Sequence, residues 1–416
     1  MSLPYIKPTT AFKYRDLRLL LTSVSLGRLS LTAMLTMLAF RIYDLTGSKS
    51  ALGTLGLAEA IPALALLLLG GHWADSGDRK RILLGSSGVW VLSVGVMAAF
   101  CLQGHESLAL FYITVVIMGF MSGINTPAMQ ATESQVLPVE VSVAASGLIG
   151  GIMSFFGLLG PALGGLLYDR VGSANGFAIL TGGLLLSHLA LYPMGHYSAR
   201  KPELDEPQMP LMESISQGWR YVRGNQVLFG AMCLDLFAVL FGGAVAMIPV
   251  FAKDILHVDK PHAGYMASAT SAGALIGMLL SVRVRPAQRA GRNLLLAVGG
   301  FGVSILVFAF SKNYWLSLAA LMFSGVFDGF SMIIRRVLFR TVVPNELRGR
   351  VGSVNMMFIG ASNEIGAAES GYAAQLLGTV PSVAAGGILC LCVVGVASFA
   401  AKELRNFRVD PATAAK

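Results

Sequence analysis

The sequence predicts an all-α polytopic membrane protein with twelve transmembrane helices in two pseudo-symmetric six-helix bundles. Composition, the length of the apolar runs and the placement of basic residues support this fold class. Of 416 residues, 55% are hydrophobic and 13% are charged, whereas a soluble domain carries roughly 25% charged residues. In lipid, every backbone polar group needs a partner within the protein, so apolar segments cross as helices or as closed barrels.

The apolar runs have the length of helices. Runs such as Leu52–Gly70 and Leu108–Gln130 come close to the roughly twenty residues that cross a bilayer as a helix. Barrel strands would instead alternate in hydrophobicity over about ten residues. We therefore expect helical spans at residues 17–42, 50–71, 82–103, 107–130, 142–168, 174–195, 226–251, 262–282, 292–311, 314–338, 351–377 and 381–401.

Basic residues gather on one side of these spans. Of the 31 lysines and arginines, 24 lie in the two termini and the loops of the same side, six lie on the other side, and Arg28 lies inside a span. Because cytoplasmic loops carry the excess of lysine and arginine, both termini are predicted to be cytoplasmic. This placement also accounts for the net charge of +9 without a nucleic-acid partner.

The longest polar stretch divides the chain near its middle. We expect an N-terminal bundle at residues 1–195, a cytoplasmic linker at 196–225 and a C-terminal bundle with a short cytoplasmic tail at 226–416. Within the linker, Leu211, Ile215 and Trp219 recur at helical spacing, which indicates an amphipathic helix. That helix either lies on the membrane face or packs against the bundles.

The two halves repeat a short motif. Residues 136–140 (VLPVE) follow the fourth span, and residues 342–346 (VVPNE) follow the tenth, 206 positions later. Halves related in this way are typical of transporters, whose substrate site lies at the interface of the repeats near the bilayer midplane. Chance similarity of two short polar loops remains the alternative.

The loop after the second span carries a specific pattern. It reads GHWADSGDRKR from Gly71 to Arg81, which resembles the G-x-L-A-D-x-x-G-R-K signature of the major facilitator superfamily. Trp73 and Asp78 replace the leucine and the second glycine of that signature. The resemblance implies a gating motif made of Gly71, Asp75, Arg79 and Lys80, in which charge-assisted hydrogen bonds stabilise one gate state.

The fifth span ends in a glycine-rich pattern. Its sequence GPALGG resembles the core of the motif typical of antiporters in the same superfamily. Glycine lets helices approach closely, and proline removes a backbone donor and permits a kink. We expect a helix-kink motif at Gly160, Pro161, Gly164 and Gly165.

The second half is similar to a bacterial subgroup of this superfamily. The subgroup includes the enterobactin (siderophore) exporter and macrolide-type efflux proteins. The resemblance rests on four segments, which read LDLFA from Leu234, FDG from Phe327, LRGRV from Leu347 and SNEIG from Ser362. It implies efflux across the inner membrane of a bacterium and favours antiport.

Charged residues inside spans are candidate functional residues, because a charge at the bilayer centre costs roughly 2.5–3.5 kcal/mol or more. A structural ion pair between Arg28 and Glu59 is as plausible as a proton role for Glu59. Arg335 could neutralise Asp328 and leave Asp235 the freer acid. The proton-coupling candidates are Asp235, Glu364, Glu59 and Asp328, and the substrate-cavity candidates are Arg28, Asn363, Glu369 and Asn125.

The expected function is secondary active transport by alternating access. No phosphate-binding loop is present, so energy must come from an ion gradient or from the solute gradient itself. We expect export of a siderophore-like or drug-like amphipathic molecule in exchange for protons. Neither a metal site nor a catalytic constellation stands out, so we expect no cofactor and no enzymatic activity. The expected partners are a small-molecule substrate, protons and the lipid bilayer, for a chain that acts as a monomer.

Two alternatives remain at this point. The chain could import a siderophore or a lysophospholipid instead of exporting one. It could also be a non-transporting membrane receptor or scaffold, which would have no need of acidic residues at mid-depth in the membrane.

Overall fold

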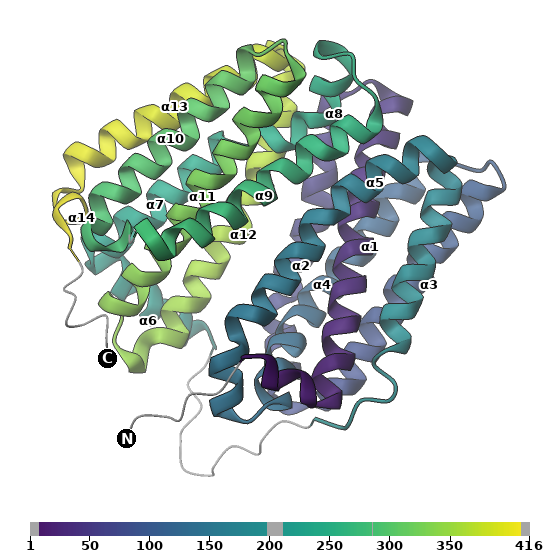
Figure 1. Cartoon of the computed structure of the whole chain (residues 1–416), viewed down its shortest axis with the longest axis horizontal. Coiled ribbons are helices and arrows are strands. Elements are labelled where there is room, and N and C mark those ends of the chain that lie inside the picture. The colour runs from purple at the N-terminus through teal and green to yellow at the C-terminus, as the bar shows by residue number, and fades with distance from the viewer. Residues whose placement is uncertain (1–7, 198–210, 285, 409–416) are drawn as a thin grey trace. The chain divides into compact units, whose positions relative to one another are not determined.

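The computed structural model describes residues 8–197, 211–284 and 286–408, and the described chain is helical almost throughout (Figure 1). Its elements follow one another as η1 Pro8–Lys13, α1 Arg15–Thr46, α2 Lys49–Ser76, α3 Arg79–Leu102, α4 Leu108–Val136, α5 Val139–Leu189, α6 Leu211–Gly224, α7 Gln226–Phe241, η2 Ala244–Met247, α8 Ile248–Val250, η3 Phe251–Ile255, α9 Lys260–Val284, η4 Pro286–Arg289, α10 Ala290–Phe310, α11 Tyr314–Val342, η5 Asn345–Leu347, α12 Arg348–Leu377, α13 Thr379–Ala400 and α14 Lys402–Asn406.

The helices account for the twelve predicted spans. Within the described residues, ten helical segments are long and apolar enough to cross a membrane. One of them belongs to α5, which changes direction at Gly172, where φ is 79°, and so supplies both the fifth and the sixth span. The polar helix α12 is the twelfth, and its 30 residues are enough to cross a bilayer. The predicted fold class is confirmed.

The chain forms two compact units. Unit 1 comprises Met1–Thr46, Ala58–Leu204 and Asp259–Ser268, and unit 2 comprises Gly47–Leu57, Asp205–Val258 and Ala269–Lys416. In unit 1, α1 packs along α5, and α3 packs against α4 and α5. In unit 2, α10 packs against α11 and α13, while α12 packs against α6, α7 and α13. The first turns of α2 and α9 thus belong to a different unit from the rest of each helix.

The offset of 206 residues seen in the loops extends to the helices themselves. Helix α4 (Leu108–Val136) and helix α11 (Tyr314–Val342) correspond residue for residue at this offset. Each begins with a capping side chain, since Ser107 accepts a hydrogen bond from the third residue after it and Asn313 does the same. The turns after the fifth and eleventh spans also correspond, because Gly172 (φ 79°) and Gly378 (φ 92°) both adopt the left-handed backbone that glycine favours.

Glycine pairs bring helices into backbone contact at equivalent places in the two units. In unit 2, a Cβ atom on Gly325 or Gly329 of α11 would lie 1.9 or 2.3 Å from a carbonyl oxygen of α9. In unit 1, a Cβ atom on Gly119 or Gly123 of α4 would lie 2.1 or 2.4 Å from a carbonyl oxygen of α2. The two pairs are related by the offset of 206. Small residues at i and i+4 are the usual means of close helix packing in lipid.

The seventh span differs from its prediction. We expected one helix over residues 226–251, but α7 ends at Phe241 and the chain continues through the short elements η2, α8 and η3 to Ile255. The break falls at Gly242 and Gly243. A Cβ atom on Gly243 would lie 2.5 Å from Ser370 Oγ and 2.6 Å from the carbonyl oxygen of Gly366. The backbone therefore contacts α12 closely at the point where α7 has ended.

The predicted amphipathic helix of the linker is α6, and it packs on unit 2. Trp219 stacks on Phe358 of α12 at 5.7 Å between ring centroids, and the Tyr221 hydroxyl donates to the carbonyl oxygen of Val342 at 2.8 Å. Val222 is fully buried. Of the two placements left open by the sequence, the structure therefore favours packing against a bundle.

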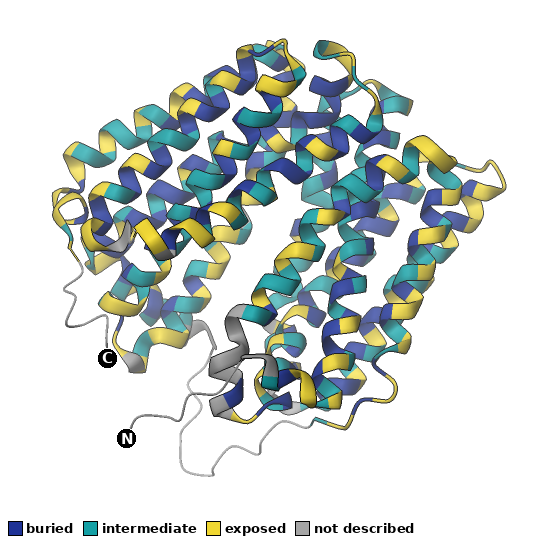
Figure 2. Ribbon diagram, in the orientation of Figure 1, coloured by how far each residue is buried: buried dark blue, intermediate teal, exposed yellow. Residues whose placement is uncertain are grey.

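Large apolar side chains cover the outer faces of the helices. Exposed positions recur along α3, α10 and α13 (Figure 2). The exposed apolar residues include Leu92, Phe310, Trp315, Leu376 and Phe399. Large exposed apolar side chains on helices of this length suit contact with lipid.

Replacing Gly325 with alanine is expected to destabilise unit 2, because the added methyl group would overlap the carbonyl oxygen of Thr270. Overpacking of this kind typically costs about 1–3 kcal/mol. Thermal unfolding of the detergent-solubilised protein should show a lower midpoint for Gly325→Ala. The matched control is Gly395→Ala in α13, where a Cβ atom meets nothing within 4 Å. Equal midpoints for the two variants would contradict the packing argument.

Candidate functional site

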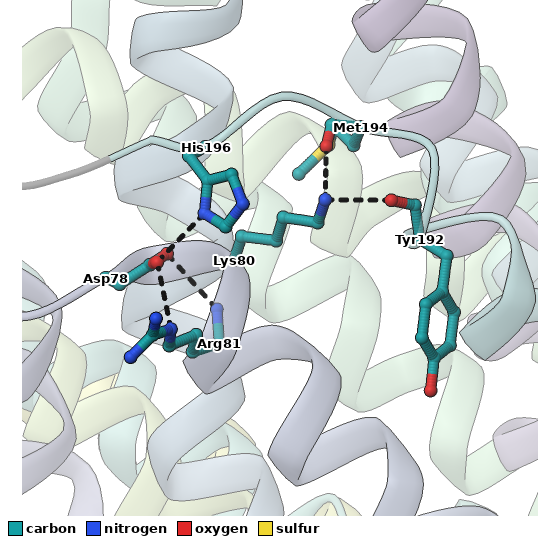
Figure 3. A network of polar contacts seen from close by, with 6 residues as sticks. All are labelled: Asp78, Lys80, Arg81, Tyr192, Met194 and His196. Atoms are coloured by element: carbon teal, nitrogen blue, oxygen red, sulfur yellow. Dashed lines mark hydrogen bonds and ion pairs between the residues drawn. The ribbon is translucent and has the colours of Figure 1, made fainter.

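The loop between α2 and α3 is held by a polar network within unit 1 (Figure 3). Asp78 caps α3 by accepting a hydrogen bond from the backbone N–H of Arg81 at 3.3 Å. Its carboxylate also lies 3.4 Å from Arg81 Nε and 3.0 Å from His196 Nδ1. Partial burial raises the pKa of Asp78, but the hydrogen bonds from His196 and from the backbone outweigh it and lower that pKa overall. Asp78, which replaces the second glycine of the superfamily signature, therefore serves as a helix cap.

The two basic residues of the gating motif bind backbone carbonyl oxygens. Arg79 Nε donates to the carbonyl of Ala74 at 2.9 Å, and its guanidinium donates to the carbonyl of Ala131 on α4 at 3.0 Å. Both Arg79 and Lys80 are buried. Cations are stabilised at the carboxyl ends of helices, where carbonyl groups lack intrahelical partners.

Lys80 makes the corresponding contacts beyond α5. Its ammonium group donates to the carbonyl oxygens of Tyr192 and Met194 at 2.8 and 2.5 Å (Figure 3). The start of α3 is thereby fastened to the ends of α4 and α5. Gly71 has open space around its Cα atom, and Asp75 belongs to α2 but its side chain lies outside the described ones.

The helix-kink motif of α5 makes backbone contacts throughout. A Cβ atom on Gly160 would overlap the Thr32 hydroxyl of α1, and one on Gly164 would lie 2.5 Å from the carbonyl oxygen of Ala33. Gly165 faces the first turns of α9, and a Cβ atom on it would lie 2.5 Å from the carbonyl oxygen of Lys260. These glycines cannot be enlarged without moving α1 or α9, so the predicted role in close helix approach has a structural basis.

Ser268 of α9 inserts into the hydrogen-bond ladder of α5 beside Pro161. The Ser268 hydroxyl donates to the carbonyl of Leu158 at 2.7 Å and accepts from the backbone N–H of Ala162 at 3.1 Å. In a regular helix these two groups bond to each other. A side chain inserted there is one of the known causes of helix bending. The sequence offered no signal for Ser268, which lies 106 residues further along the chain.

Polar contacts also surround the first residue of α9 within unit 1. Lys260 Nζ lies 2.9 and 2.8 Å from the two carboxylate oxygens of Asp44 on α1. The Tyr168 hydroxyl donates to the same carboxylate at 2.8 Å. Lys260 also lies over the Phe40 and Tyr168 rings, 5.5 and 5.3 Å from their centroids. Nearby, Arg41 forms an ion pair with Glu106. Sequence reasoning did not select these residues.

Arg28 and Glu59 do not form the ion pair that the sequence allowed. The ion pairs of the described residues include neither side chain. Arg28 is exposed on α1 and runs beside Gly157, where a Cβ atom would lie 3.0 Å from its Nε. Glu59 is half-buried on α2. The ion pair proposed as the structural role of these two residues is therefore absent from this structure.

A cluster of three charged residues lies within unit 2, and we call it the α7–α11 triad: Asp235, Asp328 and Arg335. Arg335 of α11 forms an ion pair with Asp235 of α7. Its guanidinium also lies 3.6 Å from Asp328 Oδ1, two turns earlier on α11. Asp235 is buried, whereas the Asp328 side chain keeps 38% of its surface exposed. The expectation that Asp235 would be the freer acid is wrong for this structure, because Arg335 pairs with it directly.

The remaining candidates are distributed over α12 and α4. Asn363 is exposed and its amide donates to the carbonyl of Ile359 at 3.1 Å, while Glu369 is half-buried. The side chain of Glu364 lies outside the described ones. Asn125 is buried and its amide donates to Ser86 Oγ at 2.7 Å, so we leave it out of the substrate contacts proposed below.

No group of three or more histidine, cysteine, aspartate or glutamate residues within the described parts of the chain has the arrangement of a metal site. The candidate residues of each unit are therefore separate charged and amide side chains. Such side chains can bind a polar part of a solute or exchange a proton.

Comparisons with known proteins agree with this architecture. A family model described as "Major Facilitator Superfamily" matches residues 20–292 and 237–414. The chain is 24% identical to the enterobactin exporter EntS of Shigella flexneri over 417 residues, which covers 99% of this chain and 96% of that protein. EntS of Escherichia coli strain K12 is 23% identical over the same share of both chains.

Solved transporter structures have the same fold. A bacterial homologue of the human lysosomal transporter Spinster, solved in an inward-facing and unoccupied conformation, superposes with a TM-score of 0.73 at 15% identity, over 96% of this chain and 99% of that chain. The nucleoside transporter NupG superposes with a TM-score of 0.70 at 14% identity, over 95% and 100% of the two chains. With the full-length family match, these findings show that the chain belongs to the Major Facilitator Superfamily of transporters.

Proposed function

We propose that the protein exports an amphipathic small molecule of the siderophore or drug type in exchange for protons, by alternating access. Export and a siderophore-like substrate are supported by the similarity to enterobactin exporters, which extends over 99% of the chain. The excess of lysine and arginine on one side supports a bacterial inner-membrane protein with both termini in the cytoplasm. Proton coupling is supported chiefly by one observation, the α7–α11 triad.

The triad is a departure from the internal repeat. On α4, the helix that corresponds to α11, the positions 206 residues before Asp328 and Arg335 are Ser122 and Met129. Unit 1 therefore builds the equivalent of α11 without these two charges. Because charges within a span are costly and the bundle does not require them, we infer that they are kept for function.

The composition of the triad suits the binding of a single proton. Two carboxylates and one guanidinium carry a net charge of −1 when both acids are ionised. One added proton makes the cluster neutral, and Arg335 can then pair fully with whichever carboxylate stays ionised. Since Arg335 already lies between both acids, the exchange needs only a side-chain movement. We propose that one of the two acids, Asp235 or Asp328, takes up the proton while Arg335 pairs with the other, so that loss of either acid removes the proton site.

Substrate contacts are proposed at the exposed polar positions of the spans. Arg28 in unit 1 and Asn363 in unit 2 have exposed side chains, and Glu369 is half-buried. A guanidinium recognises anionic and aromatic groups, which an acidic catechol siderophore would supply. Glu59 and Glu364 remain further candidates for proton transfer, because each is an acid within a span.

Replacing Asp235 with asparagine is expected to abolish substrate flux driven by a pH gradient, because the amide cannot take up a proton. The measurement is movement of a lipophilic dye and of a catechol siderophore in liposomes, with and without an imposed gradient. Glu364→Gln belongs in the same series, and Glu213→Gln on the exposed face of α6 is the control for loss of an acid. Intact gradient-driven flux in both Asp235→Asn and Glu364→Gln would refute the proton assignment.

Replacing Arg335 with glutamine is expected to destabilise the protein more than replacing Arg335 and Asp235 together. Removing one partner of a buried ion pair typically costs about 3–5 kcal/mol, because the remaining charge is left uncompensated. The double variant Asp235→Asn/Arg335→Gln removes both charges. Thermal midpoints in detergent test this order. If the double variant proved less stable than Arg335→Gln alone, Asp235 would not be the principal partner of Arg335.

A further inference from the structure

A pocket of about 730 Å³ lies within unit 2, where α10 begins, α13 ends and α14 follows. Figure 1 shows these three helix ends side by side at one edge of the unit. The volume of the pocket falls within the usual range for ligand pockets. It is lined by Arg289, Arg292, Leu295, Leu296, Val394, Ser398, Arg405, Asn406, Phe407 and Arg408.

The charge of this pocket has a single sign. Among the described residues, four arginines line it and no acidic residue does. Within the described part of the chain, none of the four arginines takes part in an ion pair. Among these four in the described chain, Arg405 alone donates a side-chain hydrogen bond to another residue, to the carbonyl oxygen of Ser398 at 3.2 Å. A concave surface with several uncompensated guanidinium groups attracts an anion, and guanidinium matches phosphate oxygens in pairs.

The pocket also has an apolar wall. Leu295 is buried, Val394 and Phe407 are half-buried, and Leu296 keeps 61% of its surface exposed. These side chains belong to α10, α13 and the residue after α14. A free inorganic anion would gain nothing from them. A ligand with an anionic head and an apolar chain would contact both parts of the lining.

The backbone beneath the pocket is closely packed. The N–H of Gly291 donates to the carbonyl oxygen of Phe407 at 3.3 Å. A Cβ atom on Gly291 would overlap the carbonyl oxygen of Leu404, and Leu404 is fully buried. This contact joins the start of α10 to α14 and thereby holds Arg289 and Arg292 close to Arg405 and Arg408. The arginines are therefore gathered by tertiary packing.

We propose that this pocket binds the phosphate headgroup of an anionic phospholipid of the cardiolipin or phosphatidylglycerol type, with part of an acyl chain along the apolar wall. The excess of basic residues predicts that this end of the unit lies on the cytoplasmic side, where the membrane surface carries anionic lipids. Basic pockets between helices at that level are suited to such headgroups. The site is separate from the α7–α11 triad and does not depend on proton coupling.

The experiment compares two triple variants of the full chain that lose the same charge. The pocket variant is Arg289→Gln/Arg292→Gln/Arg408→Gln. The control variant is Arg223→Gln/Arg283→Gln/Arg340→Gln, which removes three exposed arginines that do not line the pocket. Native mass spectrometry of the purified proteins, titrated with cardiolipin, phosphatidylglycerol or phosphatidylcholine, measures lipid retained per chain.

Wild-type protein is expected to retain cardiolipin and phosphatidylglycerol in preference to phosphatidylcholine. Each basic residue near an anionic surface contributes about fivefold in affinity, so the pocket variant should lose on the order of 100-fold. The control variant should stay within about fivefold of wild type. If the pocket variant does not fold, the single variant Arg292→Gln, with an expected loss of about fivefold, is compared with the single control Arg283→Gln, which should retain lipid as the wild type does.

Two results would overturn the proposal. Equal losses in the pocket and control variants would mean that only the general charge of the protein matters. Displacement of the anionic lipids by millimolar inorganic phosphate would mean that the arginines form a simple anion site and that the apolar wall plays no part. Retention of anionic lipid in the presence of phosphate, lost only in the pocket variant, supports a lipid site.

Discussion

Close backbone contact between helices at glycine is the interaction on which the rest of this structure depends. Lipid chains are as apolar as leucine, so helices in a membrane associate through packing and hydrogen bonds rather than through the hydrophobic effect. Here α4 meets α2 at Gly119 and Gly123, and α11 meets α9 at Gly325 and Gly329, with carbonyl oxygens of the neighbouring helix directly against the glycines. The same arrangement recurs at an offset of 206 residues, so one packing solution serves both units.

Against this repeated framework, the residues that break the repeat stand out. The α7–α11 triad includes two charges, Asp328 and Arg335, at positions where α4 has the uncharged Ser122 and Met129, and it places two acids around one guanidinium. Ser268 is another polar side chain with partners on a different helix, because it bonds the carbonyl oxygen of Leu158 and the N–H of Ala162 on α5 beside Pro161. In both cases a side chain from a distant helix satisfies a polar group that would be costly to leave unpaired in lipid. The same few polar residues thus pair with polar groups of the helices and carry the proposed chemistry.

Basic residues contribute in two different ways. Arg79 and Lys80 are buried and bind carbonyl oxygens at helix ends, so they fasten the α2–α3 loop within unit 1. Of the four arginines that line the pocket at the start of α10, Arg405 alone binds a carbonyl oxygen within the described chain, that of Ser398, and the pocket also has an apolar wall. A count of basic residues on one side of the membrane includes both the buried pair Arg79 and Lys80 and the pocket arginines, and it does not distinguish them. Only their surroundings separate a structural clamp from a surface that is available to a ligand.

The sequence by itself determined the fold class, the twelve spans, the amphipathic helix of the linker and the repeat, because these follow from local hydrophobic periodicity and from short motifs. It also selected Asp235, Asp328 and the motif residues, because charge or proline within an apolar run is visible without a structure. The partners could not be predicted. That Arg335 pairs with Asp235, that Arg28 and Glu59 remain apart, that Asn125 is buried against Ser86 and that α7 ends at Phe241 depend on helix rotation and on contacts between distant segments. Spacing along one helix carries no information about these contacts, so only the tertiary structure decided them.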